Sequence, residues 1–131
     1  MKKITILVFI TAFIACEKAE TNEPFITDNS LFGKWVEYEN YISPGTAWNW
    51  NAANNITVTL KPDLTYTSNN DNYFWGKNGS IENFTDSTFS IKSPLYNSGL
   101  KCYYKINNGV LEVWYPCIEG CGSRFKKVTN L

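Results

Sequence analysis

The residues of this 131-residue chain that could carry out chemistry are cysteines, carboxylates and tryptophans, because the sequence contains no histidine. Without histidine, neither a Ser-His-Asp nor a Cys-His arrangement can activate a nucleophile, and no imidazole can bind a metal. Three of the four cysteines, Cys102, Cys117 and Cys121, lie in the last third of the chain. Three thiols make a poor zinc site, and they lack the Cys-x-x-Cys spacing of redox centres. We expect no metal and no cofactor.

Glu37 and Glu39 are the carboxylates whose spacing could suit catalysis. Two positions apart on a strand, they would share one face, which the two acids of a glycoside hydrolase could exploit. A solvated strand face explains the same spacing, and no third polar group supports a catalytic pair. We therefore expect that the protein is not an enzyme.

The segment 40–54 contains Asn, Gly and Pro residues, yet it also holds Trp48 and Trp50. Because tryptophan is costly to expose, these two rings should either plug a barrel or line a pocket. The Trp-Asn-Trp alternation would also suit stacking on a sugar ring. Together with Tyr41, Trp48 and Trp50 are the ligand-binding residues that we predict.

Two pairings of the three downstream cysteines are compatible with the residues around them. A type I′ turn at residues 108–109 would make Cys102 a diagonal neighbour of Cys117 on a hairpin. Alternatively, the glycine before Cys121 lets the chain reverse, which would bring the sulfurs of Cys117 and Cys121 together. Disulfides persist in an envelope compartment, and the residues alone leave both pairings open.

The amino-terminal residues predict export. Two lysines precede an apolar run, residues 4–14, that is too short to span a bilayer as a mature helix. We expect residues 1–15 to be a signal peptide that ends directly before Cys16. Residues 16–30 carry several acids and little to bury, so we expect them to form an acidic tether.

Residues 31–131 have the pattern of one β-rich domain. The chain holds eight Phe, eight Tyr and five Trp, and its 12 basic residues equal its 12 acidic residues, which suggests no nucleic-acid face. Apolar residues alternate with polar ones, and no window predicts an amphipathic helix. We expect eight or nine short strands, near residues 34–41, 55–61, 64–68, 73–77, 80–84, 87–92, 100–106, 110–116 and 123–128.

The connections between these strands are short. Lys61-Pro62-Asp63-Leu64 suits a type I turn, and the Asn-Gly pairs at residues 78–79 and 108–109 suit type I′ hairpins. Short turns favour an up-and-down antiparallel sheet that removes its edges by closing. We therefore expect an all-β, up-and-down antiparallel β-barrel, with a β-sandwich as the second architecture. An eight-stranded barrel can be filled by side chains or can hold one small ligand.

Several short motifs make the chain similar to a known family. Gly33 and Trp35 form a Gly-x-Trp that resembles the opening of the first lipocalin strand, and Arg124 resembles the Arg that packs across that Trp in lipocalins. The residues that end at Cys16 resemble the lipobox of bacterial lipoproteins. The Lys-Pro-Asp turn and the Cys-x-Glu-Gly-Cys run of residues 117–121 resemble those of small lipocalin-like lipoproteins of Bacteroidetes. The second lipocalin signature, Thr-Asp-Tyr, is missing.

This resemblance implies a structural framework. Cys16 would be acylated and would anchor the chain in the outer membrane, on its periplasmic or surface side. The family's Cys-x-Glu-Gly-Cys run favours a Cys117–Cys121 disulfide, which would leave Cys102 as a buried thiol. Gly33, Trp35 and Arg124 would close the base of the barrel, with the Arg stacked on the Trp.

The resemblance also implies a function. We expect a monomeric barrel that binds a small apolar or amphipathic ligand at a mouth formed by Tyr41, Trp48 and Trp50. The alternatives are a protein-interaction or inhibitor module that acts through the barrel loops, like the small barrel lipoproteins that block lysozyme, and a carbohydrate-binding surface lipoprotein. An open lumen would favour the carrier, and a filled lumen would favour a surface binder.

Overall fold

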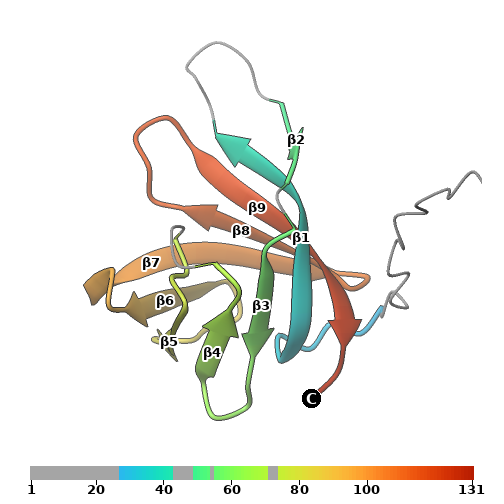
Figure 1. Cartoon of the computed structure of the whole chain (residues 1–131), viewed down its shortest axis with the longest axis horizontal. Coiled ribbons are helices and arrows are strands. Elements are labelled where there is room, and N and C mark those ends of the chain that lie inside the picture. Colours follow the sequence, from blue (N-terminus) through green and yellow to red (C-terminus); the bar gives the residue numbers. More distant parts are fainter. Residues whose placement is uncertain (1–26, 43–48, 54, 71–73) are drawn as a thin grey trace, which may run out of the picture.

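The computed structural model describes residues 27–42, 49–53, 55–70 and 74–131, so the predicted signal peptide, Cys16 and Trp48 lie outside the described residues. Within these ranges no helix has the length and apolar character needed to cross a membrane. The nine strands of the described part (Figure 1) are β1 (Gly33–Ile42), β2 (Asn51–Ala52), β3 (Thr57–Leu60), β4 (Thr65–Ser68), β5 (Asn78–Glu82), β6 (Thr88–Ser93), β7 (Tyr96–Asn107), β8 (Val110–Tyr115) and β9 (Cys121–Thr129).

The strands form a closed antiparallel barrel. From β3 to β9 each strand pairs with the next along the chain, and β1 pairs with both β3 and β9. The short β2 pairs only with the far part of β1, where Glu39 lies opposite Ala52. The described chain is therefore an eight-stranded up-and-down barrel with one extra strand (Figure 1), which confirms the predicted all-β, lipocalin-like architecture.

One predicted strand and one predicted turn are wrong. The described residues of the range 73–77 form no strand, and residues 78–79 lie inside β5, where Gly79 pairs with Tyr66. A Cβ at Gly79 would collide with the Lys92 carbonyl and with the Tyr66 ring. This glycine therefore permits a close approach between neighbouring strands rather than a hairpin turn.

The second Asn-Gly pair does make the predicted turn. Asn108 has φ 48° and Gly109 has φ 70°, and positive φ at both central residues is what a type I′ turn requires. The hairpin register follows from this turn, since Tyr104 lies opposite Val113. The turn after β3 also forms, and the Leu64 N–H donates to the Lys61 carbonyl at 3.0 Å.

Large apolar side chains fill the inside of the barrel. Trp75, from the segment between β4 and β5, meets Tyr66 edge-on at 5.2 Å between ring centroids and donates its indole N–H to the Tyr115 hydroxyl at 2.9 Å. The preceding Phe74 stacks on Tyr115 at 4.1 Å. The buried core consists mainly of aromatic and branched side chains, among them Trp35, Tyr66, Trp75, Phe89, Phe125, Leu60, Ile91, Leu111 and Val113. Together these side chains form the buried core of the described part of the barrel.

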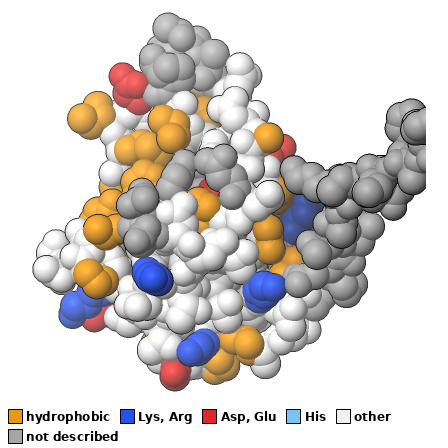
Figure 2. Space-filling view, in the orientation of Figure 1, with side chains coloured by type: hydrophobic (Ala, Val, Ile, Leu, Met, Phe, Trp, Pro, Cys, Tyr) orange, Lys and Arg blue, Asp and Glu red, His pale blue; other side chains and the backbone are white. Residues whose placement is uncertain are grey.

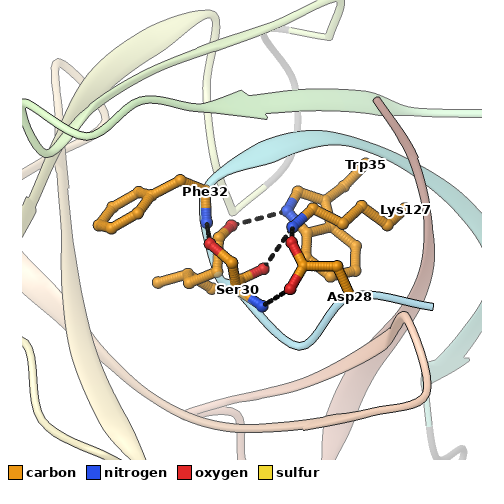
Figure 3. Close-up of polar contacts among 6 residues, drawn as sticks. Asp28, Ser30, Phe32, Trp35 and Lys127 are labelled. Carbon is orange, nitrogen blue, oxygen red and sulfur yellow. Dashed lines mark hydrogen bonds and ion pairs between the residues drawn. The ribbon is translucent and has the colours of Figure 1, made fainter. Parts of the chain in front are cut away.

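The base of the barrel is closed by residues 27–32, which we call the strap (Figure 3). The side chain of Lys127 is fully buried, and its Nζ donates to Asp28 Oδ2 at 2.8 Å and to the Ser30 carbonyl at 2.7 Å. The same Nζ lies 5.3 Å from the centroid of the Trp35 ring. Trp35 donates its indole N–H to the Leu31 carbonyl at 2.8 Å. The strap is therefore held by a buried cation and by a buried indole.

The cation over Trp35 is Lys127, and the predicted stacking of Arg124 on this indole does not occur. The register between β1 and β9 places Trp35 opposite Lys127, whereas Arg124 lies opposite Glu39. Positions 124 and 127 are an odd number of residues apart on one strand, so their side chains point to opposite faces. Gly33 does belong to this closure, because a Cβ there would collide with the Lys127 side chain and with the Thr129 carbonyl.

Candidate functional site

Tyr41 and Trp50, two of the three predicted ligand-binding residues, lie together on the outer face of the barrel rather than over its lumen. Their ring centroids are 5.7 Å apart at an angle of 49°. On β9 the facing residue of Tyr41 is Gly122, which lies on the outward side of the strand with Arg124. Trp50 directly precedes β2, whose pairing with β1 holds the indole against this face.

A β-bulge in β1 explains why these residues face outward. Glu37 lies opposite Phe125 and Glu39 lies opposite the next residue, Arg124, so Tyr38 is an extra residue in the strand. A bulge reverses the alternation of side chains beyond it. Glu37 therefore points into the core, and Glu39 points outward. The predicted pairing of these two carboxylates on one face is wrong for this reason.

Glu37 is a buried acid. Its side chain is only 1% exposed, and its Oε2 atom has no hydrogen-bond partner. Burial raises the pKa of Glu37 above its ordinary value, and a hydrogen bond with Ser123 opposes this shift. The carboxyl lines neither of the two pockets described below.

Arg124 joins three strands on the outer face. Its Nε donates to Glu112 Oε1 at 3.0 Å and its Nη1 donates to Glu39 Oε2 at 3.1 Å. The guanidinium carbon lies 4.0 Å from the centroid of a Trp50 ring. Desolvation alone would lower the pKa of Arg124, but the hydrogen bonds and charges of the two glutamates raise it overall. The arginine is therefore a fixed cation with two fixed counter-charges.

Beside this ion pair lies a cleft of about 410 Å³, which we call the aromatic pocket. Trp114 is 37% exposed on its wall, as the alternation along β8 predicts for an outward residue. Hydrophobic side chains gather at the end of the barrel that carries the connection between β8 and β9 (Figure 2). The residues that line the aromatic pocket are Tyr41, Trp50, Glu112, Trp114, Tyr115, Gly120, Cys121 and Arg124.

A second cleft of about 350 Å³, which we call the polar pocket, lies on the other side of the same ion pair. Lys126 covers the Tyr38 ring there, with its Nζ 4.5 Å from the centroid. Burial raises the pKa of Tyr38, and the charge of Glu39 adds to this effect. The residues that line the polar pocket are Tyr38, Lys105, Asn107, Asn108, Val110, Glu112 and Arg124.

The cysteines have structural roles. Cys117 and Cys121 form a disulfide, with Cα atoms 5.9 Å apart, which confirms the predicted pairing. Cys102 is a buried free thiol, as expected, and burial raises its pKa to about 12. Such a thiol is almost entirely protonated at neutral pH and is a poor nucleophile. Ile118, inside the disulfide loop, is fully exposed.

No group of three or more His, Cys, Asp or Glu side chains among the described residues could hold a metal ion. The outer face offers a ligand stacking on rings and hydrogen bonding to Arg, Glu, Lys and Asn side chains. Glu112 and Trp114 alternate with buried residues along β8 and therefore share its outward face. The partners of Glu112 and the place of Arg124 were not predicted, because they depend on the register that closes the barrel.

No family model, curated protein or solved structure matches this chain. The fold and the site define it as a closed antiparallel β-barrel whose described outer face carries the aromatic and the polar pocket. The resemblance to lipocalin-like lipoproteins stays a prediction from the motifs.

Proposed function

We propose that this chain is an envelope lipoprotein of the lipocalin-like kind, whose barrel is a non-enzymatic binding module for a small amphipathic molecule. The observation that supports this most is the aromatic pocket, which combines the exposed Trp114 ring with a fixed ion pair on one wall. Its rings can cover the apolar part of a ligand, while Arg124 and Glu112 face the polar part. The ligand would bind on the outer side of the barrel, where Trp50, Trp114 and Arg124 line this pocket.

The geometry of the chain suits a tethered protein. The strap enters at the base of the barrel, where Asp28 meets Lys127, whereas Tyr41 lies near the far end of β1. An acyl chain on Cys16 would tether the barrel to the membrane through the residues that precede the strap. The apolar run before Cys16 is the sequence feature on which this anchor rests.

The proposed binding can be tested with the amphipathic dye 8-anilinonaphthalene-1-sulfonate. The dye should bind the folded barrel saturably, and Trp114→Ala should weaken its binding about tenfold, because the substitution removes the exposed ring of the pocket. Tyr103→Ala is the matched control, since Tyr103 is an exposed aromatic residue opposite Trp114 that lines neither pocket. Equal effects of the two substitutions, or no binding at all, would reject the proposal.

A second function, a protein-interaction or inhibitor module, is favoured by one observation. Ile118 and the half-exposed Ile42 flank a shallow apolar hollow of about 440 Å³ at the disulfide. A lysozyme inhibition assay tests this function directly. Inhibition by the parent protein that is lost in Ile118→Ser, with dye binding unchanged, would support the inhibitor function. A lack of inhibition by the parent protein would reject it.

A further inference from the structure

The aromatic and polar pockets adjoin each other. Both are lined by Glu112 and Arg124, so the ion pair of these residues forms the floor between them. The outward residues of β8 run from Trp114 in one pocket through Glu112 to Val110 in the other. Four residues of a strand span about 13 Å, which is longer than a single sugar ring.

We propose that the two pockets form one groove that binds an uncharged, linear oligosaccharide of two or more rings. This inference rests on the proposed binding function and names the chemical class of its ligand. One ring would stack in the aromatic pocket, and the chain would continue over the ion pair into the polar pocket.

The charges in the groove favour an uncharged ligand. Arg124 has its two counter-charges in Glu39 and Glu112, and Lys105 lies opposite Glu112 on the neighbouring strand. Lys126, over the Tyr38 ring, adds a third cation, so the side chains around the groove carry one net positive charge. What they present to a ligand is a set of oriented donors and acceptors with little net charge, which matches a row of hydroxyl groups better than an anionic head group.

The distribution of rings and amides favours a sugar over a long alkyl chain. Trp114 offers an exposed ring at one end, and the side chains of Asn107 and Asn108 are exposed at the other end. An alkyl chain that filled both pockets would cover the ion pair and these amides without satisfying their hydrogen bonds, which is unfavourable. A sugar chain has an apolar face for the indole and hydroxyl groups for the amides.

The test is an array of neutral oligosaccharides, followed by calorimetry of the best binder as a series of one to four rings. The affinity should rise from one ring to two or more. Trp114→Ala should weaken the binding of every length about tenfold. Asn108→Gly keeps the left-handed turn and removes the amide, so it should weaken the longer members about threefold to tenfold and leave the single ring unchanged. Tyr103→Ala is again the control.

The possible results separate this inference from the proposed function. If the dye binds in a Trp114-dependent manner and no neutral oligosaccharide binds, the oligosaccharide assignment is overturned and the proposed function stands. If neither the dye nor any oligosaccharide binds, both the oligosaccharide assignment and the proposed function are rejected. Equal affinities for one ring and for four rings, or an unaffected Asn108→Gly variant, would show that the two pockets do not act as one groove.

Discussion

Asp28 in the strap forms an ion pair with Lys127. Removal of the more exposed partner, Asp28, should destabilise the barrel more than removal of the buried partner, Lys127. The Lys127 side chain is 0% exposed and the Asp28 side chain is 42% exposed. Asp28→Asn keeps the shape of the side chain but leaves the Lys127 ammonium buried without a counter-charge, which is the costly way to break such a pair. Lys127→Met removes the buried charge itself, and Asp28 can then return to water.

The loss in the free energy of unfolding expected for Lys127→Met follows from the contacts that the substitution removes. The substitution removes a charge-assisted hydrogen bond to Asp28, another to the Ser30 carbonyl and the cation near the Trp35 ring. The apolar replacement avoids the desolvation of an ammonium, so the net loss should be about 1–2 kcal/mol. For a domain of this size, this corresponds to a fall in the melting temperature of roughly 5–10 °C.

Thermal denaturation of both single variants and of the double variant measures this prediction. Asp28→Asn should melt below Lys127→Met, and the double variant should melt above Asp28→Asn, because it no longer buries an unpaired charge. The pair also makes stability depend on pH. The hydrogen bond from Lys127, followed by one from the Ser30 backbone, lowers the pKa of Asp28, so its contribution is present above the ordinary pKa of 3.8 and is lost as the pH falls through the lowered value. If Asp28→Asn melts with the parent protein, the strap does not close the barrel in this way.

Three further predictions follow from other parts of the chain. Burial raises the pKa of Glu37, so its contribution to stability is fully present below the ordinary pKa of 4.5 and is lost as the pH rises through the raised value. Glu37→Gln should therefore stabilise the barrel by roughly 1–2 kcal/mol at pH 8 and leave its melting temperature at pH 4 unchanged. A lower melting temperature of Glu37→Gln at pH 8 would refute this. The disulfide closes a short loop, so replacing both Cys117 and Cys121 by Ser should cost about 2 kcal/mol in urea denaturation, and no loss would mean that the loop is held by other contacts. Cys16→Ala should release the protein from membranes on fractionation, and unchanged membrane association would contradict the anchor.

Local patterns predicted the parts of the fold that depend on local chemistry. The Asn-Gly pair at residues 108–109 predicted the left-handed turn that sets the register of the hairpin between β7 and β8. The same dipeptide at residues 78–79 misled, because an Asn-Gly pair does not reveal whether its glycine serves a turn or a close approach of strands. For both Asn-Gly pairs, the structure that forms depends on a few neighbouring residues or on one neighbouring strand.

The candidate site depended on long-range register instead. Nothing in the residue type of Tyr38 marks it as the extra residue of a bulge, since a tyrosine suits any outward position of a strand. The choice between Arg124 and Lys127 as the partner of Trp35 depends on how β9 aligns with β1 across the closure. Motif similarity identified the type of contact, a cation against the first tryptophan, but not the residue that makes it.

The bulge at Tyr38 connects the closure of the barrel to the site on its outer face. Before the bulge, β1 sends its large side chains into the core, and beyond it Tyr41 turns outward to meet Trp50. Inside the barrel, Trp75 packs on Tyr66, whereas Tyr41 is buried on the outer side, against Trp50. Arg124 then spans β8, β9 and β1, so the strands that close the barrel also carry the groove. A ligand in that groove would contact both sides of the closure, so its binding would stabilise the folded barrel as well as occupy the site.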